Sequence, residues 1–180
     1  MEEFPRGKLI NHNRIYSGRI VDLVVDTIEI GGTEHIREVV RHPGGVVFLG
    51  ETADGSIPFV RQLRYPLDRV LLELPAGKID PNEDPATSAA REMEEETGLR
   101  PLGAEFVLSF YSSPGFCDEK LHLFYANRLE KTAPNLEQDE HLRVEFHSLN
   151  EALEMARKGE IEDAKTLVAL LWLKAKRAGE

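Results

Sequence analysis

The sequence predicts an α/β (α+β) protein in which a mixed β-sheet lies between helices and follows an N-terminal β-hairpin appendage. Short apolar segments, bounded by Gly, Pro, Asn or Asp, recur along the chain and are typical of strands. Three segments with helical start or stop signals are interleaved with these strands. Strands mixed with helices in this order favour a sheet that is covered by helical layers.

The first part of the chain, residues 1–42, is expected to form the appendage. Residues 14–30 alternate in places between polar and apolar side chains, and Gly31-Gly32 is a hairpin signal before a return strand at residues 35–40. An isolated hairpin is only marginally stable in water. The appendage must therefore pack on its own domain or on a second subunit.

Six further strands are expected in the remaining chain, residues 43–180. The first two are expected to pair with each other across a turn at residues 53–55. The expected strands cover residues 46–50, 57–63, 70–74, 104–111, 121–129 and 143–147.

Two helices are expected near the C-terminus. Ser148 or Asn150 is a candidate N-cap for a helix over residues 151–158, and Gly159 is expected to end it. The last helix is expected from about residue 163 to 176, and its leucines form a wide apolar stripe that indicates core packing.

Length and composition suit one domain with a small appendage. The chain has 180 residues, of which 41% are hydrophobic, and its net charge is −10 from 32 acidic and 22 basic residues. This balance argues against duplex nucleic acid as a partner, because binding to phosphates requires a basic surface. It does not exclude a small anionic substrate, whose charge bound cations and a few arginines can neutralise locally.

Three further features predict a cytoplasmic protein without a membrane partner. The single cysteine, Cys117, cannot form an internal disulfide, which suits a reducing compartment. The first ten residues lack the apolar region of a signal peptide, and the apolar stretch at residues 167–173 is too short to cross a bilayer.

The most informative segment is residues 77–99, which contains three closely spaced glutamates. Glu92, Glu95 and Glu96 stand at i, i+3 and i+4, so they share one face of a helix. Like charges at this spacing destabilise a helix unless a cation lies among them. Clusters made only of carboxylates suit hard ions such as Mg²⁺ or Mn²⁺.

The ends of this helix are also encoded. Asp84-Pro85 places a capping acid before a proline at the first helical position, and Gly98 stands where a C-terminal glycine is expected. Upstream, Pro75-Ala76-Gly77 ends the expected strand at residues 70–74. The order strand, glycine loop and helix places loop backbone groups beside the acidic face.

A charged helix face of this kind is often only a solvated surface. The complete pattern is much more specific, because it matches the Nudix box, G-x5-E-x7-R-E-U-x-E-E-x-G-U with U apolar, and a chance match in one chain has a probability on the order of one in ten million. The segment therefore resembles the Nudix hydrolases, which cleave nucleoside diphosphates linked to another moiety. The matching residues are Gly77, Glu83, Arg91, Glu92, Met93, Glu95, Glu96, Gly98 and Leu99.

The resemblance implies roles for several of these residues. Glu92, Glu95 and Glu96 would bind the metal together with the backbone carbonyl of Ala76. Arg91 would orient the carboxylates, although a purely local charge role is the alternative.

The general base that accepts a proton from the attacking water has two candidates, a box glutamate, of which Glu95 is favoured, and Glu119. Glu119 lies in the segment SSPGFCDEK, whose Pro114 follows Leu99 by fifteen residues. The same spacing is found in the ADP-ribose pyrophosphatase branch of the family, which this sequence therefore resembles. In that branch an acidic residue after the Ser-Pro-Gly turn commonly acts as the general base. Glu119 is the favoured candidate, although an ordinary exposed loop acid is the simpler interpretation.

Two arginines are candidates for substrate binding. Arg64 and Arg37 match places where the resemblance implies contacts with the diphosphate or with adenine, and a guanidinium suits both. Surface salt bridges are the alternative for each. The same branch is typically a dimer with exchanged N-terminal sheets, which implies that residues 1–42 lie at a homodimer interface.

Taken together, the resemblance implies Mg²⁺-dependent hydrolysis of ADP-ribose to AMP and ribose 5-phosphate. A sister branch that hydrolyses GDP-mannose shares the Ser-Pro-Gly segment, so a GDP-mannose or broad nucleoside-diphosphate-sugar hydrolase is the alternative enzyme. A non-catalytic nucleotide-sugar sensor is the alternative from another class, but the intact box argues against it.

Overall fold

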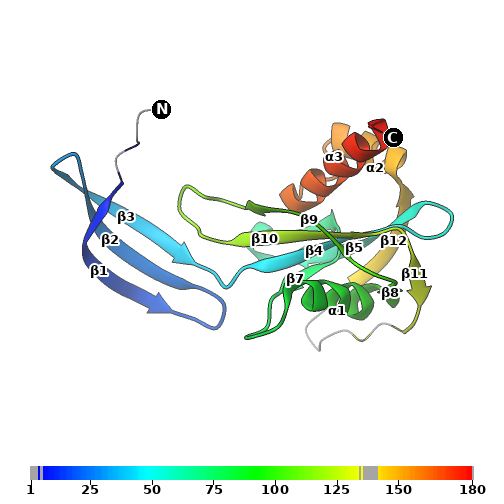
Figure 1. Cartoon of the computed structure of the whole chain (residues 1–180), viewed down its shortest axis with the longest axis horizontal. Coiled ribbons are helices and arrows are strands. Elements are labelled where there is room, and N and C mark those ends of the chain that lie inside the picture. The colour runs from blue at the N-terminus through cyan, green and yellow to red at the C-terminus, as the bar shows by residue number, and fades with distance from the viewer. Residues whose placement is uncertain (1–3, 5, 134, 136–141, 180) are drawn as a thin grey trace. The chain divides into compact units, whose positions relative to one another are not determined.

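The computed structural model describes residues 4, 6–133, 135 and 142–179. The chain divides into two compact units. Figure 1 shows the whole chain, coloured by residue number from blue at the N-terminus to red at the C-terminus. Residues 1–44 and 111–120 form the first unit, and residues 45–110 and 121–180 form the second.

The first unit contains an antiparallel sheet with the strand order β1-β2-β3. These strands are β1 (Lys8–Ser17), β2 (Asp22–Ile30) and β3 (Thr33–Arg41). Gly31 and Gly32 have φ angles of 60° and 80°, which suit glycine, and they turn the chain between β2 and β3. The expected hairpin is confirmed, and β1 extends it to a three-stranded sheet.

The second unit is built on a mixed sheet with the strand order β7-β4-β10-β9. β4 pairs in parallel with β10 and antiparallel with β7. Every residue of β4 is buried, as expected for a central strand that is covered on both faces. The strands are β7 (Ala76–Lys78), β4 (Gly45–Gly50), β10 (Lys120–Ala126) and β9 (Glu105–Tyr111).

A second sheet in this unit has the order β12-β5-β6, and it comprises β12 (Leu142–Ser148), β5 (Ser56–Arg64) and β6 (Arg69–Glu73). The short 3-10 helix η1 (Tyr65–Leu67) joins β5 to β6, and β8 (Leu99–Pro101) pairs with β11 (Leu129–Lys131). The prediction that residues 46–50 and 57–63 pair with each other was wrong, because β4 and β5 belong to different sheets.

Helices cover both faces of the mixed sheet, as Figure 1 shows for α1 (Pro85–Thr97) on one side and for α2 (Leu149–Arg157) and α3 (Ala164–Ala178) on the other. Alternate residues of β4 point to opposite faces. Val46 and Phe48 pack in the cluster that contains Met93 of α1, whereas Val47 and Leu49 pack in the cluster of α2 and α3. The predicted sheet between helices is confirmed.

The C-terminal helices begin at side-chain caps. Ser148 forms a capping box with Glu151, and the Asp163 carboxylate accepts the backbone N–H of Thr166. Of the two predicted caps for α2, Ser148 is therefore the correct one. No helix in the described part of the chain is long and apolar enough to cross a membrane.

Candidate active site

The site predicted from residues 77–99 is built on α1, whose ends match the sequence signals. The Asp84 carboxylate accepts the backbone N–H groups of Ala86 and Thr87 at 3.0 and 3.2 Å, and Pro85 opens the helix. At the other end Gly98 has a φ of 67°, and its N–H donates to the Glu94 carbonyl at 2.8 Å. The glutamates at positions 92, 95 and 96 therefore lie on a helix whose two ends are defined by the caps Asp84 and Gly98.

The buried face of α1 fixes the direction of its acidic face. Met93 and Ala89 are 0% and 1% exposed and pack against Val46 and Phe48 of β4. Burial of a methionine side chain contributes about 1.5–3 kcal/mol, enough to hold the rotation of a short helix. Glu92 and Glu96 flank this buried face, and Glu96 itself is only 3% exposed.

Ala76 and Gly77, which were expected in a glycine loop, form the start of β7 and lie directly against two of the three glutamates. The Ala76 N–H donates to Oε2 of Glu96 at 3.1 Å. A Cβ atom added to Gly77 would lie 2.0 Å from Cδ of Glu92. Any side chain at position 77 would have to displace the Glu92 carboxylate from its present place. The start of β7 and the acidic helix face are thus in contact.

This contact predicts that Gly77→Ala strongly impairs turnover. The added methyl must displace the Glu92 carboxylate, and we expect turnover to fall by about 100-fold, with a smaller effect on stability because only the flexible end of the Glu92 side chain has to move. Gly179→Ala is the matched control, since its Cβ would meet neighbours at an ordinary 3.7 Å. Thermal unfolding and steady-state kinetics of both variants provide the measurement, and a fully active Gly77→Ala protein would contradict this reading.

Arg91 connects the acidic residues of the helix and the loop. Its Nη1 donates to Oε1 of Glu92 and to Oε2 of Glu95, both at 2.9 Å. Its Nε and Nη2 donate to the two carboxylate oxygens of Glu83 at 3.2 and 3.1 Å. One guanidinium therefore orients three carboxylates at once, an arrangement for which a planar fork of donors is suited.

Glu83 is held as a carboxylate on the loop. Hydrogen bonds from Arg91 and then from Ser88 lower its pKa from 4.5 to about 2. A carboxyl group whose pKa is lower in the folded state stabilises the protein above its unfolded-state pKa. This stabilisation is lost as the pH falls from about 4.5 towards 2.

We therefore expect Glu83→Gln to destabilise the protein near neutral pH, and we expect this effect to shrink below pH 4.5 and to become small only at about pH 2. Urea unfolding of both proteins across this pH range gives the difference in unfolding free energy. An Arg91→Met background should remove most of the difference, because the partner that lowers the pKa of Glu83 most is absent while Ser88 remains. A difference that does not change with pH would contradict the proposed pairing.

The donor set fits a hard divalent cation. Glu92, Glu95 and Glu96 share one face of α1, and Ala76 and Gly77 of β7 lie against it, so every candidate ligand is an oxygen atom. Among the described residues, no three His, Cys, Asp or Glu side chains are already gathered as a metal-binding cluster. In this arrangement the carboxylates of Glu92 and Glu95 accept from Arg91, and that of Glu96 accepts from the Ala76 amide.

A second charged cluster surrounds Arg64 at the end of β5. Its Nε and Nη2 donate to the two carboxylate oxygens of Glu73 at 2.7 and 2.6 Å, and Lys165 of α3 also contacts this buried acid. Burial raises the pKa of Glu73, but the two cations outweigh it, so its pKa lies below the usual value. The sequence offered no signal for Lys165, which is separated from Glu73 by 92 positions.

The remaining predicted residues, Glu119 and Arg37, belong to the first unit. Oε1 of Glu119 lies 3.5 Å from Nδ1 of His42. Arg37 is exposed on β3, and its Nη1 donates to the carbonyl of Ile36 at 2.9 Å. The other predicted site residues all belong to the second unit, where Arg91 contacts Glu92 and Glu95. These residues are Arg91, Glu92, Glu95, Glu96, Ala76 and Arg64.

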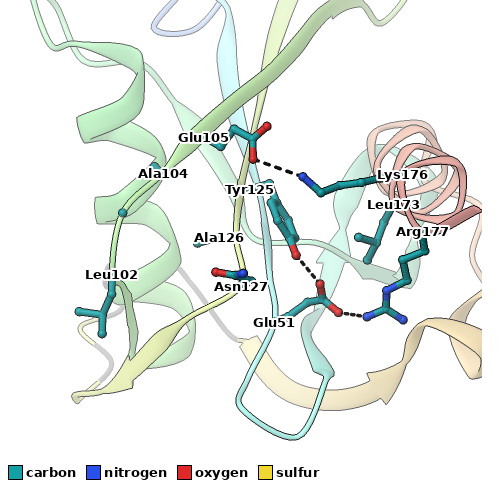
Figure 2. Close-up of a pocket in the computed structure, with 11 residues that line it drawn as sticks. Glu51, Leu102, Ala104, Glu105, Tyr125, Ala126, Asn127, Leu173, Lys176 and Arg177 are labelled. Carbon is teal, nitrogen blue, oxygen red and sulfur yellow. Dashed lines mark hydrogen bonds and ion pairs between the residues drawn. The ribbon is translucent and has the colours of Figure 1, made fainter. Parts of the chain in front are cut away.

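The second unit also contains a cavity of about 580 Å³ at the carboxyl ends of β4 and β10, shown in Figure 2. Glu51 is buried in its wall, accepts the Tyr125 hydroxyl at 2.6 Å and pairs with Arg177 of α3. Lys176 lies over the Tyr125 ring and 3.5 Å from Glu105. No box residue lines this cavity, and these ion pairs fasten the end of α3 to the sheet.

Comparison with known proteins agrees with this geometry. The NUDIX domain model matches residues 41–170. An ADP-ribose pyrophosphatase from Bacillus subtilis (strain 168) is 40% identical over 174 residues, which cover 95% of this chain and 94% of that protein. A methanol dehydrogenase activator from Bacillus methanolicus is 41% identical over 174 residues with the same coverage.

Two further similarities are informative. A GDP-mannose pyrophosphatase from Cronobacter sakazakii (strain ATCC BAA-894) is 36% identical over 179 residues, covering 93% of this chain and 92% of that protein. The solved structure of an ADP compounds hydrolase matches with a TM-score of 0.87 over 99% of this chain and 98% of that one, at 18% identity, which supports the fold. With a family model over most of its length and relatives of this identity, the chain belongs to the Nudix hydrolases, enzymes that generally require a divalent metal ion.

Proposed function

We propose that this protein hydrolyses the pyrophosphate bond of ADP-ribose to AMP and ribose 5-phosphate in the presence of Mg²⁺. The observation that carries the proposal is the complete acidic box on α1, whose carboxylates Arg91 orients and which lies against Ala76 and Gly77 of β7. Relatives named ADP-ribose pyrophosphatase, at 40% and 32% identity over most of the chain, support the choice of substrate.

The metal site in this proposal consists of Glu92, Glu95, Glu96 and the backbone carbonyl of Ala76. A divalent ion held by these residues would neutralise the anionic pyrophosphate oxygens and would lower the pKa of a water molecule. Mg²⁺ is the proposed ion, because it prefers oxygen ligands, and Mn²⁺ could substitute for it. Arg91 keeps the carboxylates of Glu92 and Glu95 oriented through its 2.9 Å hydrogen bonds.

Glu119 is the proposed general base, and Glu95 is the alternative. A carboxylate suits this task if it lies within hydrogen-bond reach of the attacking water. Arg64 and Arg37 are proposed to bind the diphosphate or the adenine. The bidentate pairing with buried Glu73 supports Arg64, since it fixes the orientation of the guanidinium.

We also propose a cytoplasmic homodimer with residues 1–42 at its interface and residues 43–180 as the hydrolase domain. Every residue of β1 is exposed, and the sheet of the first unit carries exposed apolar side chains, among them Leu9, Ile15, Tyr16 and Ile36. A second subunit would bury this surface. The free thiol of Cys117 is compatible with a reducing compartment. Light scattering should give about twice the chain mass of 20.3 kDa, and a monomer would contradict the dimer.

The test of function is product release from a panel of nucleoside diphosphate derivatives, with Mg²⁺ and with a chelator. AMP should appear fastest from ADP-ribose and should not appear with the chelator. Faster turnover of GDP-mannose would replace the proposed substrate, an alternative favoured by the relative at 36% identity. Binding without product from any member would overturn the proposed activity and favour a sensor of nucleotide sugars.

A further inference from the structure

The segment that carries Glu119 is attached by its backbone to the end of β3. Val40 donates its N–H to the Phe116 carbonyl at 2.8 Å, and Asp118 donates its N–H to the Val40 carbonyl at 3.1 Å. The Ser112 N–H donates to the Glu119 carbonyl at 3.3 Å and closes the base of the segment. The first unit thus fixes the backbone just before Glu119 and at the Glu119 carbonyl itself.

The Asp118 side chain adds two further attachments to the same strand. Its Oδ1 accepts the backbone N–H of His42 at 2.8 Å, and its Oδ2 accepts Nη1 of Arg41 at 3.0 Å. Partial burial raises the pKa of Asp118, but the His42 amide and Arg41 outweigh it, so its pKa lies below the usual value. The carboxylate is therefore charged at neutral pH and can hold both donors.

Arg41 is itself positioned from the interior of the sheet. Its Nη2 lies 3.6 Å from Oδ2 of Asp26, which is only 7% exposed and whose Oδ1 lies 2.6 Å from Nδ1 of His12. A buried acid on β2 thus holds the guanidinium that holds Asp118. This continuous chain of contacts runs from the sheet of the first unit to the residue preceding Glu119.

Glu119 has a weaker contact of its own. Its Oε1 lies 3.5 Å from Nδ1 of His42, and the same nitrogen accepts the Gly44 N–H at 3.1 Å. At 3.5 Å this contact is longer than an ordinary hydrogen bond, so it constrains the Glu119 side chain only weakly. The position of Glu119 therefore depends on the backbone that Asp118 secures.

We infer that Asp118 is a positioning residue for Glu119, and that Arg41, held by the buried Asp26, fixes the Asp118 carboxylate. This inference rests on the proposed role of Glu119 as the general base. A general base displaced by about 1 Å loses on the order of 100-fold in rate. The contacts from Asp26 through Arg41 to Asp118 therefore serve to hold Glu119 in the position that proton transfer requires.

The test is a cycle of Asp118→Asn, Glu119→Gln and the double variant, assayed with the substrate that the panel identifies. An asparagine keeps an acceptor for the His42 N–H but loses the charge that holds Arg41. We expect Asp118→Asn to lower kcat by about 10- to 100-fold and to change KM by less than about threefold. In the Glu119→Gln background it should cause no further loss, because it acts only through that residue.

Two matched variants complete the design. Asp22→Asn removes a half-buried acid of the same sheet that lies 3.9 Å from Arg14, and it should leave turnover unchanged. Arg41→Lys should retain more activity than Arg41→Met, since it keeps the charge beside Asp118. This pair also tests the inference if Asp118→Asn does not fold.

The outcomes separate the inference from the function on which it rests. Normal turnover of Asp118→Asn, beside a strongly impaired Glu119→Gln, overturns the positioning role and leaves the proposed base intact. Losses that multiply in the double variant also overturn it, because Asp118 then acts independently. Normal turnover of Glu119→Gln overturns the proposed base itself, and the inference with it.

Discussion

Glu96→Gln is expected to reduce turnover by about 10³-fold, since a loss of about 4 kcal/mol of metal-dependent transition-state stabilisation corresponds to that factor. Glutamine keeps the shape of the side chain and an oxygen for the Ala76 N–H, which Glu96 now accepts at 3.1 Å. It removes the negative charge that the proposed metal ion needs. The measurement is steady-state product formation across a range of Mg²⁺ concentrations.

Glu94→Gln is the matched control on the same helix. Glu94 pairs with Arg100 at 2.9 Å on the exposed side and is not a proposed ligand. Its substitution should leave turnover within about twofold of the original protein, because exposed pairs contribute little. A similar loss in both variants would show that general damage to α1, and not loss of a ligand, explains the effect.

Glu119→Gln is expected to reduce kcat by about 10²- to 10⁴-fold, the usual contribution of general acid–base catalysis. Calorimetric titration should show Mg²⁺ affinity close to that of the original protein, since Glu119 is not among the proposed ligands. This combination of lost turnover and retained metal binding distinguishes a base from a ligand.

Glu34→Gln, an exposed acid on β3 in the same unit, serves as the control and should retain full activity. If Glu119→Gln turns over at a near-normal rate, the base must be sought among the box residues. Glu95→Gln is then the decisive variant, although its loss of activity must be separated from loss of metal by the same titration.

Local signals in the sequence predicted the elements that depend on neighbouring residues. The caps Asp84 and Gly98 define α1, and Gly31-Gly32 defines the β2–β3 turn, because each requires only a few adjacent positions. The same local reasoning failed for β4 and β5. A turn between two apolar segments suggested a hairpin, but β4 is buried on both faces and pairs with β10, about 75 positions away.

For the candidate site too, the sequence predicted the residues related by local spacing but not the contacts between distant positions. The spacing of Glu92, Glu95 and Glu96 was readable because helical periodicity places them on one face. The contact of Lys165 with Glu73, and that of Arg41 with Asp118, join positions far apart in the chain. Such contacts depend on tertiary packing, and no pattern along the sequence indicates them.

The assignment of residues 111–120 to the same compact unit as residues 1–44 has a consequence for exchange between relatives. These two stretches are distant in the sequence but depend on each other structurally, because Val40, Arg41 and His42 form hydrogen bonds with residues 116 and 118 of the second stretch. Grafting residues 111–120 alone into another member would separate them from their support. Recombination that preserves activity should therefore transfer both stretches from the same parent, and substitutions at positions 41 and 118 should covary.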